Sequence, residues 1–152
     1  MANFYAGKSG IEIYTDGAAR GNPGPSASGF IVLEEGKLLN EQSVYNGQAT
    51  NNYAEYNAVI LALGWCIENF HEPGCIDIEL YSDSELIIRQ LAGRYKVKSE
   101  DLAPLNEKAV ELIHKFKSVK LNNVPRGNLH ITEVDRNLNI LLDRLGPGKG
   151  AR

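Results

Sequence analysis

Apolar and polar residues alternate along several short stretches of the chain, and each stretch predicts a β-strand. The alternation is strictest over residues 76–81, where Ile, Ile and Leu occupy every second position. The Glu-Glu-Gly-Lys sequence that precedes Leu38 is typical of a hairpin turn, so two of the strands should pair directly. The expected strands cover residues 11–15, 29–33, 38–45, 76–81 and 129–134.

Between these strands, apolar residues recur three or four positions apart, which predicts helices. The expected helices are a long one opening at residues 50–52, a short one over 84–91, one over 101–117 and a closing one over 139–145. Strands mixed with helices in this order indicate an α/β fold with a mixed sheet. The sequence shows neither an internal repeat nor a linker, so residues 1–145 should form a single domain. Residues 146–152, rich in Gly, should form a flexible tail.

Composition narrows the class of protein without naming an activity. The 152 residues are 43% hydrophobic and 23% charged, as in ordinary soluble domains. No apolar run approaches the roughly 20 residues of a membrane span, and the N-terminus lacks a signal-peptide core, so a cytoplasmic location is expected. The net charge of −3 argues against a strongly basic nucleic-acid coat but is compatible with nucleic acid handled through metal ions. Cys66 and Cys75 form no zinc-ligand pattern.

Four acidic residues, Asp16, Glu55, Asp83 and Asp143, fall at comparable ends of the expected elements. Each has an ordinary structural explanation. Asp-Gly is a common turn pair, Asn52 and Glu55 fit a capping box, Asp83 could cap the next helix, and Asp143 could simply face solvent. These explanations are four separate coincidences, whereas one shared site accounts for all four acids.

A cluster of carboxylates suits a hard cation such as Mg²⁺ or Mn²⁺. Two such ions can hold the attacking and leaving oxygens of a phosphoryl displacement. The turn after Asp16 is rich in Gly and Pro and carries Arg20 and Asn22, which suit a phosphate or sugar. The sequence contains no Gly-x-Ser-x-Gly, Walker loop or His-Glu-x-x-His motif that would indicate competing chemistry.

The four acids lie in four segments that can be considered together. They are Tyr-Thr-Asp-Gly (14–17) with Gly-Asn-Pro-Gly-Pro (21–25), Thr-Asn-Asn-Tyr-Ala-Glu-Tyr (50–56), Tyr-Ser-Asp-Ser (81–84), and a last motif over 134–145. The last motif contains Val134, Arg136, Asn139, Asp143 and Leu145. Together these segments resemble ribonuclease H of type 1, the class that cuts the RNA strand of RNA–DNA hybrids. They run in family order and cover nearly the whole chain.

The resemblance implies a five-stranded mixed sheet with its second strand antiparallel, flanked by about four helices. It implies a centre of two Mg²⁺ ions, or Mn²⁺ in their place, held by Asp16, Glu55, Asp83 and Asp143. Metal-activated water would then cut the RNA strand and leave 5′-phosphate and 3′-hydroxyl ends. The RNA–DNA hybrid is the expected partner of a monomeric enzyme with no membrane association. The expected substrate contacts are Gly17, Asn22, Asn51, Asn52, Ser84 and Arg136.

The fourth acid has an alternative. Residues 124–128 imitate the start of the last motif, and in that register Asp135 would be the ligand. That register places residues 131–134 in a loop, which would leave a good strand pattern unused, so Asp143 is the preferred assignment. Many family members also carry a histidine in the loop before the last helix. Residues 134–139 contain none, and Arg136 is the nearest cation there.

Two other functions are compatible with the same residues. One is a module that binds hybrids or duplexes without cutting them, which the missing histidine and the short, modestly basic segment 93–99 would suit. Against it, four acids are poor partners for a phosphate backbone. The other is a nuclease that also cuts double-stranded RNA, whose shape overlaps with that of the hybrid.

Overall fold

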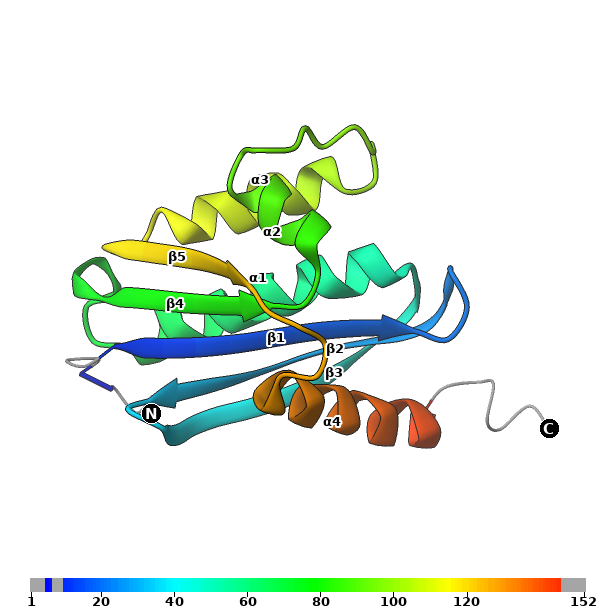
Figure 1. Cartoon of the computed structure of the whole chain (residues 1–152), viewed down its shortest axis with the longest axis horizontal. Coiled ribbons are helices and arrows are strands. Elements are labelled where there is room, and N and C mark those ends of the chain that lie inside the picture. Colours follow the sequence, from blue (N-terminus) through cyan, green and yellow to red (C-terminus); the bar gives the residue numbers. More distant parts are fainter. Residues whose placement is uncertain (1–4, 7–9, 146–152) are drawn as a thin grey trace.

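The computed structural model describes residues 5–6 and 10–145, and within them five strands form one mixed sheet (Figure 1). The strands are β1 (Ile11–Ala19), β2 (Gly24–Glu34), β3 (Lys37–Ala49), β4 (Asp77–Ser82) and β5 (Ser118–Asn123). The helices are α1 (Asn51–Asn69), the 3₁₀ turn η1 (Pro73–Cys75), α2 (Glu85–Leu91), α3 (Ala103–Ile113) and α4 (Leu129–Leu145). None of the helices in the described ranges is long and apolar enough to span a membrane.

The strands lie side by side in the order β3-β2-β1-β4-β5. β2 runs antiparallel to β1 and β3, while β4 and β5 run parallel to β1. The expected mixed sheet with an antiparallel second strand is therefore confirmed. Because β1 and β4 are parallel neighbours, their carboxyl ends meet at one edge of the sheet, where open α/β sheets place ligands.

Each face of the sheet is covered by helices, and each has its own apolar core. On one face, Ile13 of β1 and Leu80 of β4 pack with Val59 and Leu63 of α1. On the other face, Tyr14 of β1 packs with Leu138 and Leu142 of α4. This two-sided burial explains why β1 is nearly continuous in buried residues instead of alternating. The arrangement fixes α1 and α4 on opposite sides of the end of β1 (Figure 1).

The strand expected over residues 129–134 is wrong, because these residues form the first turns of α4. The local alternation of apolar and polar residues does not mark a strand face, because Leu129 is 84% exposed. The buried residues follow a helical spacing: Ile131, Val134, Leu138 and Leu142. The Asn128 side chain accepts hydrogen bonds from the amides of His130 and Ile131, at 3.0 and 3.1 Å, and so caps the helix start. The closing helix therefore begins ten residues before the expected position at Asn139.

The fifth strand instead covers Ser118–Asn123 at the edge of the sheet. Within this strand only Val119 and Leu121 pack against the core, and the other residues are polar. The apolar pattern is therefore too short to predict a strand. The helix expected over 101–117 is correspondingly shorter, since α3 ends at Ile113. The tail expected at 146–152 lies outside the described residues.

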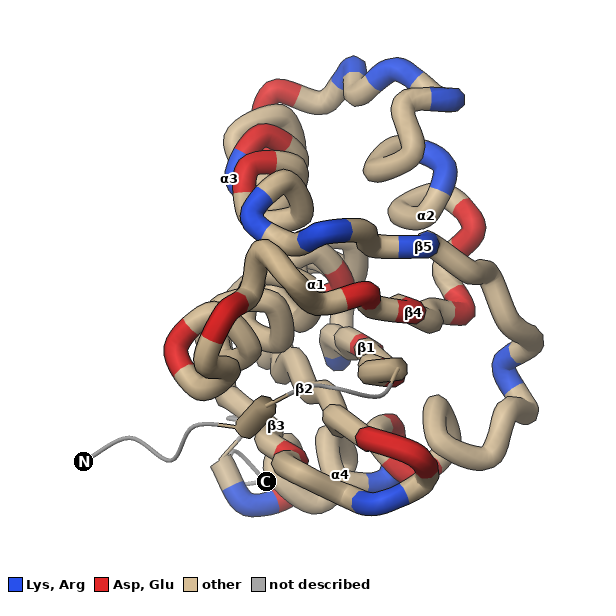
Figure 2. Tube along the Cα trace, turned by 90° about the vertical axis from the view of Figure 1, so that its left-hand side faces the viewer, with Lys and Arg blue, Asp and Glu red and all other residues tan. Residues whose placement is uncertain are grey.

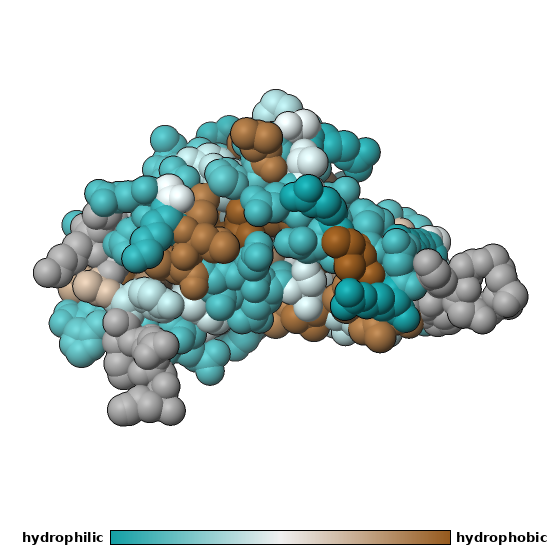
Figure 3. Space-filling model, turned by 90° about the horizontal axis from the view of Figure 1, so that it is seen from below, coloured by the Kyte–Doolittle hydropathy of each residue, from teal (hydrophilic) through white to brown (hydrophobic). Residues whose placement is uncertain are grey.

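The surface seen from the α4 side is mostly hydrophilic, with apolar patches between the polar side chains (Figure 3). The large exposed apolar residues of α4 are Leu129, Ile140 and Leu145. They are separated along the helix by polar residues, so α4 presents a mixed outer face.

Candidate metal centre

Asp16 occupies the last buried position of β1, where its side chain is next to the start of α1. The Gly17 amide donates hydrogen bonds to the Asp16 Oδ1 and the Glu55 Oε1, both at 2.9 Å. A Cβ on Gly17 would lie 2.3 Å from the Ala54 carbonyl carbon, so only glycine permits this approach of strand and helix. Gly17 therefore brings the carboxylates of Asp16 and Glu55 to one amide group.

Glu55 does not form the capping box that its spacing from Asn52 suggested. Thr50 is the N-cap of α1, and its hydroxyl accepts from the Tyr53 amide at 3.1 Å. The Glu55 carboxylate points instead across to β1, where Gly17 donates to it. The N-terminal part of α1 thus places an acid at the carboxyl end of the sheet.

Asp83 follows directly after β4, and its side chain is only 11% exposed. It is not the cap of α2, because the Ser84 hydroxyl accepts from the Ile87 amide at 3.3 Å and takes that role. Ser84, which was expected to contact substrate, forms this helix cap and does not line the pocket described below. Asp83 is left facing the other acids.

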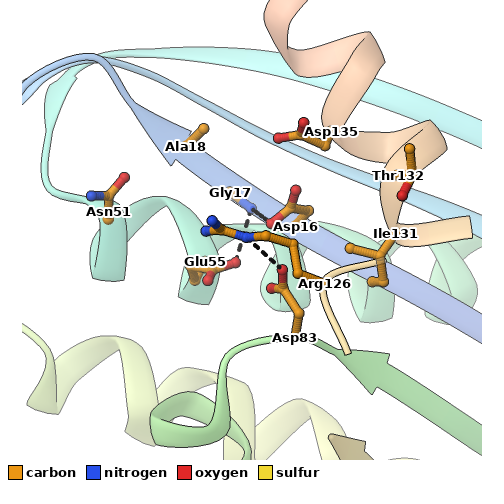
Figure 4. Close-up of a pocket in the computed structure, with 10 residues that line it drawn as sticks. All are labelled: Asp16, Gly17, Ala18, Asn51, Glu55, Asp83, Arg126, Ile131, Thr132 and Asp135. Atoms are coloured by element: carbon orange, nitrogen blue, oxygen red, sulfur yellow. Dashed lines mark hydrogen bonds and ion pairs between the residues drawn. The ribbon is translucent and has the colours of Figure 1, made fainter. Parts of the chain in front are cut away.

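One carboxylate oxygen from each of Asp16, Glu55 and Asp83 lies within 4.8 Å of the others. Figure 4 shows the three side chains converging at the bottom of a pocket of about 450 Å³. The remaining lining residues come from β1, α1, the β5–α4 loop and the first turns of α4: Gly17, Ala18, Asn51, Arg126, Ile131, Thr132 and Asp135. The three acids predicted from separate segments of the sequence are thus brought together.

Burial, together with repulsion from neighbouring carboxylates, raises the pKa of all three carboxylic acids. The pKa of Asp16 rises to about 7, first because of burial and then because of the charges of Asp83 and Asp135. Burial and the Asp16 charge hold the pKa of Glu55 well above its usual value. Burial also raises the pKa of Asp83, while the nearby Arg126 guanidinium partly offsets that rise. Such a cluster is electrostatically unfavourable when ionised, and a multivalent cation would relieve the repulsion.

The structure does not bring Asp143, the preferred fourth acid, to these three. Asp143 is not among the residues that line the pocket; its Oδ1 pairs with the Arg20 guanidinium at 2.7 Å. Asp135 lines the pocket instead, and Figure 4 shows it on α4 above Asp16. The physical reason is the helix itself, because eight residues at 1.5 Å per residue separate the two acids by about 12 Å along its axis. The strand that favoured the Asp143 register does not exist.

Arg126 is a site residue that the sequence did not single out. Its Nε lies 3.8 Å from the Asp83 Oδ2, and its side chain is 95% exposed. With α4 starting at Leu129, the loop before the last helix is residues 124–128, so Arg126 and not Arg136 is its cation. The Pro-Arg-Gly sequence before Asn128, a turn followed by a helix cap, was the available signal.

The other expected substrate contacts lie in different surroundings. Asn51 lines the pocket; its Oδ1 accepts from the Ala19 amide at 2.8 Å, and its own amide donates to Asn22 Oδ1 at 2.9 Å. Asn52 is half-buried on α1 and Arg136 is exposed on α4, and neither lines the pocket. The first turn of α1 and the β1–β2 turn are therefore fastened together beside the acids.

Three basic residues lie close together in the sequence, away from the acids. Arg94, Lys96 and Lys98 lie on the segment between α2 and α3. Figures 1 and 2 both show this segment at the end of the molecule opposite α4.

Comparison with known proteins gives a consistent family assignment. The model of the RNase H family matches residues 8–131. The chain is 40% identical over 117 residues to Ribonuclease HI of Halobacterium salinarum, which covers 76% of this chain and 57% of that protein. It is 35% identical over 135 residues to the Bifunctional protein Rv2228c of Mycobacterium tuberculosis, covering 88% of this chain and 35% of that protein.

Among solved structures, LC11-RNase H1 in complex with an RNA/DNA hybrid superposes with a TM-score of 0.82 at 37% identity. The superposition covers 88% of this chain and 97% of that one. A family model that matches most of the sequence, a shared sheet topology and the converging acids agree. The chain belongs to the RNase H family.

Proposed function

We propose that this protein is a metal-dependent endonuclease that hydrolyses the RNA strand of RNA–DNA hybrids, leaving 5′-phosphate and 3′-hydroxyl ends. The observation that carries the proposal is the convergence of Asp16, Glu55 and Asp83 within 4.8 Å in an open pocket. The RNA/DNA hybrid bound by LC11-RNase H1, a protein of the same fold, supports the choice of substrate.

The donor set fits a hard divalent cation. It consists of carboxylates without cysteine, and burial makes their simultaneous ionisation costly unless a cation is present. Asp16, Glu55 and Asp83, with Asp135 as the fourth acid, would hold two Mg²⁺ ions or Mn²⁺ in their place. Bound there, the cations supply an activated water and neutralise charge at the scissile phosphate.

The protein's own residues hold and orient the substrate around this centre. The Asn51 side chain and the backbone near Ala18 line the pocket beside Asp16, where they can contact the sugar-phosphate chain. A side-chain amide can contact 2′-hydroxyl groups, since it both donates and accepts hydrogen bonds. This gives the site a means of recognising an RNA strand without reading its bases.

Arg126 would bind a phosphate at the mouth of the pocket. An arginine side chain has five N–H donors and no acceptor, so it lacks the proton-accepting nitrogen of a neutral histidine. It can instead donate two parallel hydrogen bonds to phosphate oxygens. In this proposal the residue in the loop before α4 assists by charge and not by proton transfer.

Cleavage of an end-labelled RNA–DNA hybrid in Mg²⁺ tests the proposal. The wild type should yield RNA fragments with 5′-phosphate and 3′-hydroxyl ends, and Asp16→Asn should yield none. Tight binding of the hybrid without turnover in Mg²⁺ or Mn²⁺ would instead establish a non-catalytic binding module. Turnover that survives Asp16→Asn would place the chemistry elsewhere.

A cytoplasmic location and a monomeric state, both expected from the sequence, remain part of the proposal. Light scattering at the concentration of the cleavage assay tests the second, and an activity that appears only with dimer formation would contradict it.

A further inference from the structure

Arg20, in the turn between β1 and β2, contacts α4 through three acceptors. Its Nη1 lies 2.7 Å from the Asp143 Oδ1. Its Nη2 donates to the side-chain oxygen of Asn139 at 3.0 Å and to the Asn139 carbonyl at 3.3 Å. One guanidinium group therefore binds two successive turns of the helix.

The contact continues along α4 to the acid in the pocket. The Asn139 Nδ2 donates to the Asp135 carbonyl oxygen at 2.9 Å. Asp135, Asn139 and Asp143 are spaced four residues apart and so form one ridge of the helix. Arg20 is thus joined to the backbone of Asp135 through a single side chain.

The same turn is fastened on its other side to α1. The Ala19 amide donates to Asn51 Oδ1 at 2.8 Å, and the Asn51 amide donates to Asn22 Oδ1 at 2.9 Å. The Arg20 amide donates to the Pro25 carbonyl at 2.8 Å, which closes the turn on itself. The turn therefore connects β1, α1 and α4, the elements that carry Asp16, Glu55 and Asp135.

We propose that Arg20, held by Asp143 and Asn139, is a positioning residue that sets the distance between Asp135 and the other three carboxylates. Asp143 then affects the metal centre only indirectly, by holding the Arg20 side chain in place. The inference depends on the proposed function, in which Asp135 is the fourth ligand. Since the Arg20 and Asp143 side chains are 39% and 53% exposed, their ion pair contributes little to global stability, so its loss should act on the site and not on folding.

The test is calorimetric titration of Mn²⁺ into the intact protein without substrate, followed by steady-state cleavage of a hybrid. The variants are Arg20→Ala, Asn139→Ala, Asp143→Asn and the double variant Arg20→Ala/Asp143→Asn. Lys108→Ala is the matched control, because Lys108 also forms an exposed ion pair, with Glu111 on α3 at 3.4 Å.

Arg20→Ala and Asn139→Ala should each weaken Mn²⁺ binding about three- to tenfold, below the effect of removing a group that directly orients a ligand. The double variant should match Arg20→Ala alone, because both changes interrupt one connection. KM for the hybrid should stay within about twofold of wild type while kcat falls, as expected when substrate binding is unaffected. Lys108→Ala should change neither quantity.

Unaltered Mn²⁺ binding in Arg20→Ala would overturn the inference. The inference would also fail if Arg20→Ala raised KM in a salt-sensitive way while Asp143→Asn changed neither quantity. That pattern would identify Arg20 as a phosphate contact. Asp135→Asn in the same titration separates the two proposals. If it also leaves Mn²⁺ binding intact, the proposed metal centre fails; if it alone weakens binding, only the positioning role fails.

Discussion

Two aspartates on α4, Asp135 near its middle and Asp143 near its C-terminus, lie in opposite surroundings. Asp135 lies in a pocket with Asp16, Glu55 and Asp83, and its charge helps to raise the pKa of Asp16. Asp143, eight residues later, pairs with Arg20 at 2.7 Å. One aspartate adds to a concentration of negative charge and the other is neutralised by a neighbouring cation. Residue type and helical context alone therefore cannot distinguish the two aspartates, whereas the partners of each side chain can.

The largest difference between the two acids should be in catalysis. Asp135→Asn should lower kcat for hybrid cleavage at least about 100-fold, because an amide removes a charged ligand and the electrostatic stabilisation that depends on it. Asp143→Asn should lower kcat less than about tenfold, since it acts only through Arg20. Single-turnover cleavage in saturating Mg²⁺ measures both.

Equal losses of kcat in these two variants would remove the distinction between Asp135 and Asp143. A larger loss in Asp143→Asn would restore the register that the sequence first favoured.

The second difference should be in the pH dependence of stability without metal. The pKa of Asp16 is about 7 in the folded protein, above its ordinary value of 3.8. Between these values the folded state binds more protons than the unfolded state, so the free energy of unfolding falls as pH rises. The loss should be about 1–3 kcal/mol from pH 5 to pH 8, given roughly 1.4 kcal/mol per pKa unit and sharing of protons within the cluster.

Urea unfolding in EDTA at several pH values checks this expectation. Asp16→Asn should flatten the dependence, while Asp143→Asn should leave it as in wild type. A wild type that becomes more stable from pH 5 to pH 8 would contradict the crowding of carboxylates.

The third prediction concerns Arg126, the cation beside the pocket, which should act on the bound substrate. Arg126→Ala should lower kcat/KM about five- to tenfold, the loss of one exposed charge-assisted phosphate contact. The pH–rate profile should keep its shape, because a guanidinium does not titrate in the working range. Arg126→Lys should recover part of the loss. Disappearance of a limb of the profile in Arg126→Ala would show a proton-transfer role instead.

The smallest effect should be on folding at the Asp143 end. Asp143→Asn should change the free energy of unfolding by less than about 1 kcal/mol, as for other exposed ion pairs. Leu142→Ala, one residue away and fully buried, should cost about 2–4 kcal/mol in the same denaturant titration. An Asp143→Asn loss as large as that of Leu142→Ala would make the ion pair a main support of the helix.

Much of the fold was readable because strong local patterns agreed with the final structure. β4 alternates because one of its faces is fully buried while the other is only partly covered. The hairpin at residues 34–37 pairs β2 with β3 as expected. The acids of the first three motifs lie on elements whose type was predicted correctly. Their convergence depends on parallel pairing of β1 and β4 and on the lack of a side chain at Gly17.

The strand predicted over residues 129–134 was wrong for a physical reason. Residues 129–134 alternate in polarity by chance, and the exposure of Leu129 becomes evident only in three dimensions. The buried set of α4 is periodic over the whole helix, so a window extended back to the Asn128 cap favours a helix and, with it, Asp135. The ion pair of Asp143 with Arg20 joins residues 123 positions apart, which no local pattern could predict.

The central claim is that the metal centre lies beside Asp135 and not beside Asp143. Its most direct test is anomalous diffraction from crystals of the protein soaked in Mn²⁺. We predict anomalous peaks in the pocket, in contact with the carboxylates of Asp16 and Asp135, and an intact Arg20–Asp143 ion pair. A peak coordinated by Asp143, or a pocket without Mn²⁺ at millimolar concentration, would contradict it.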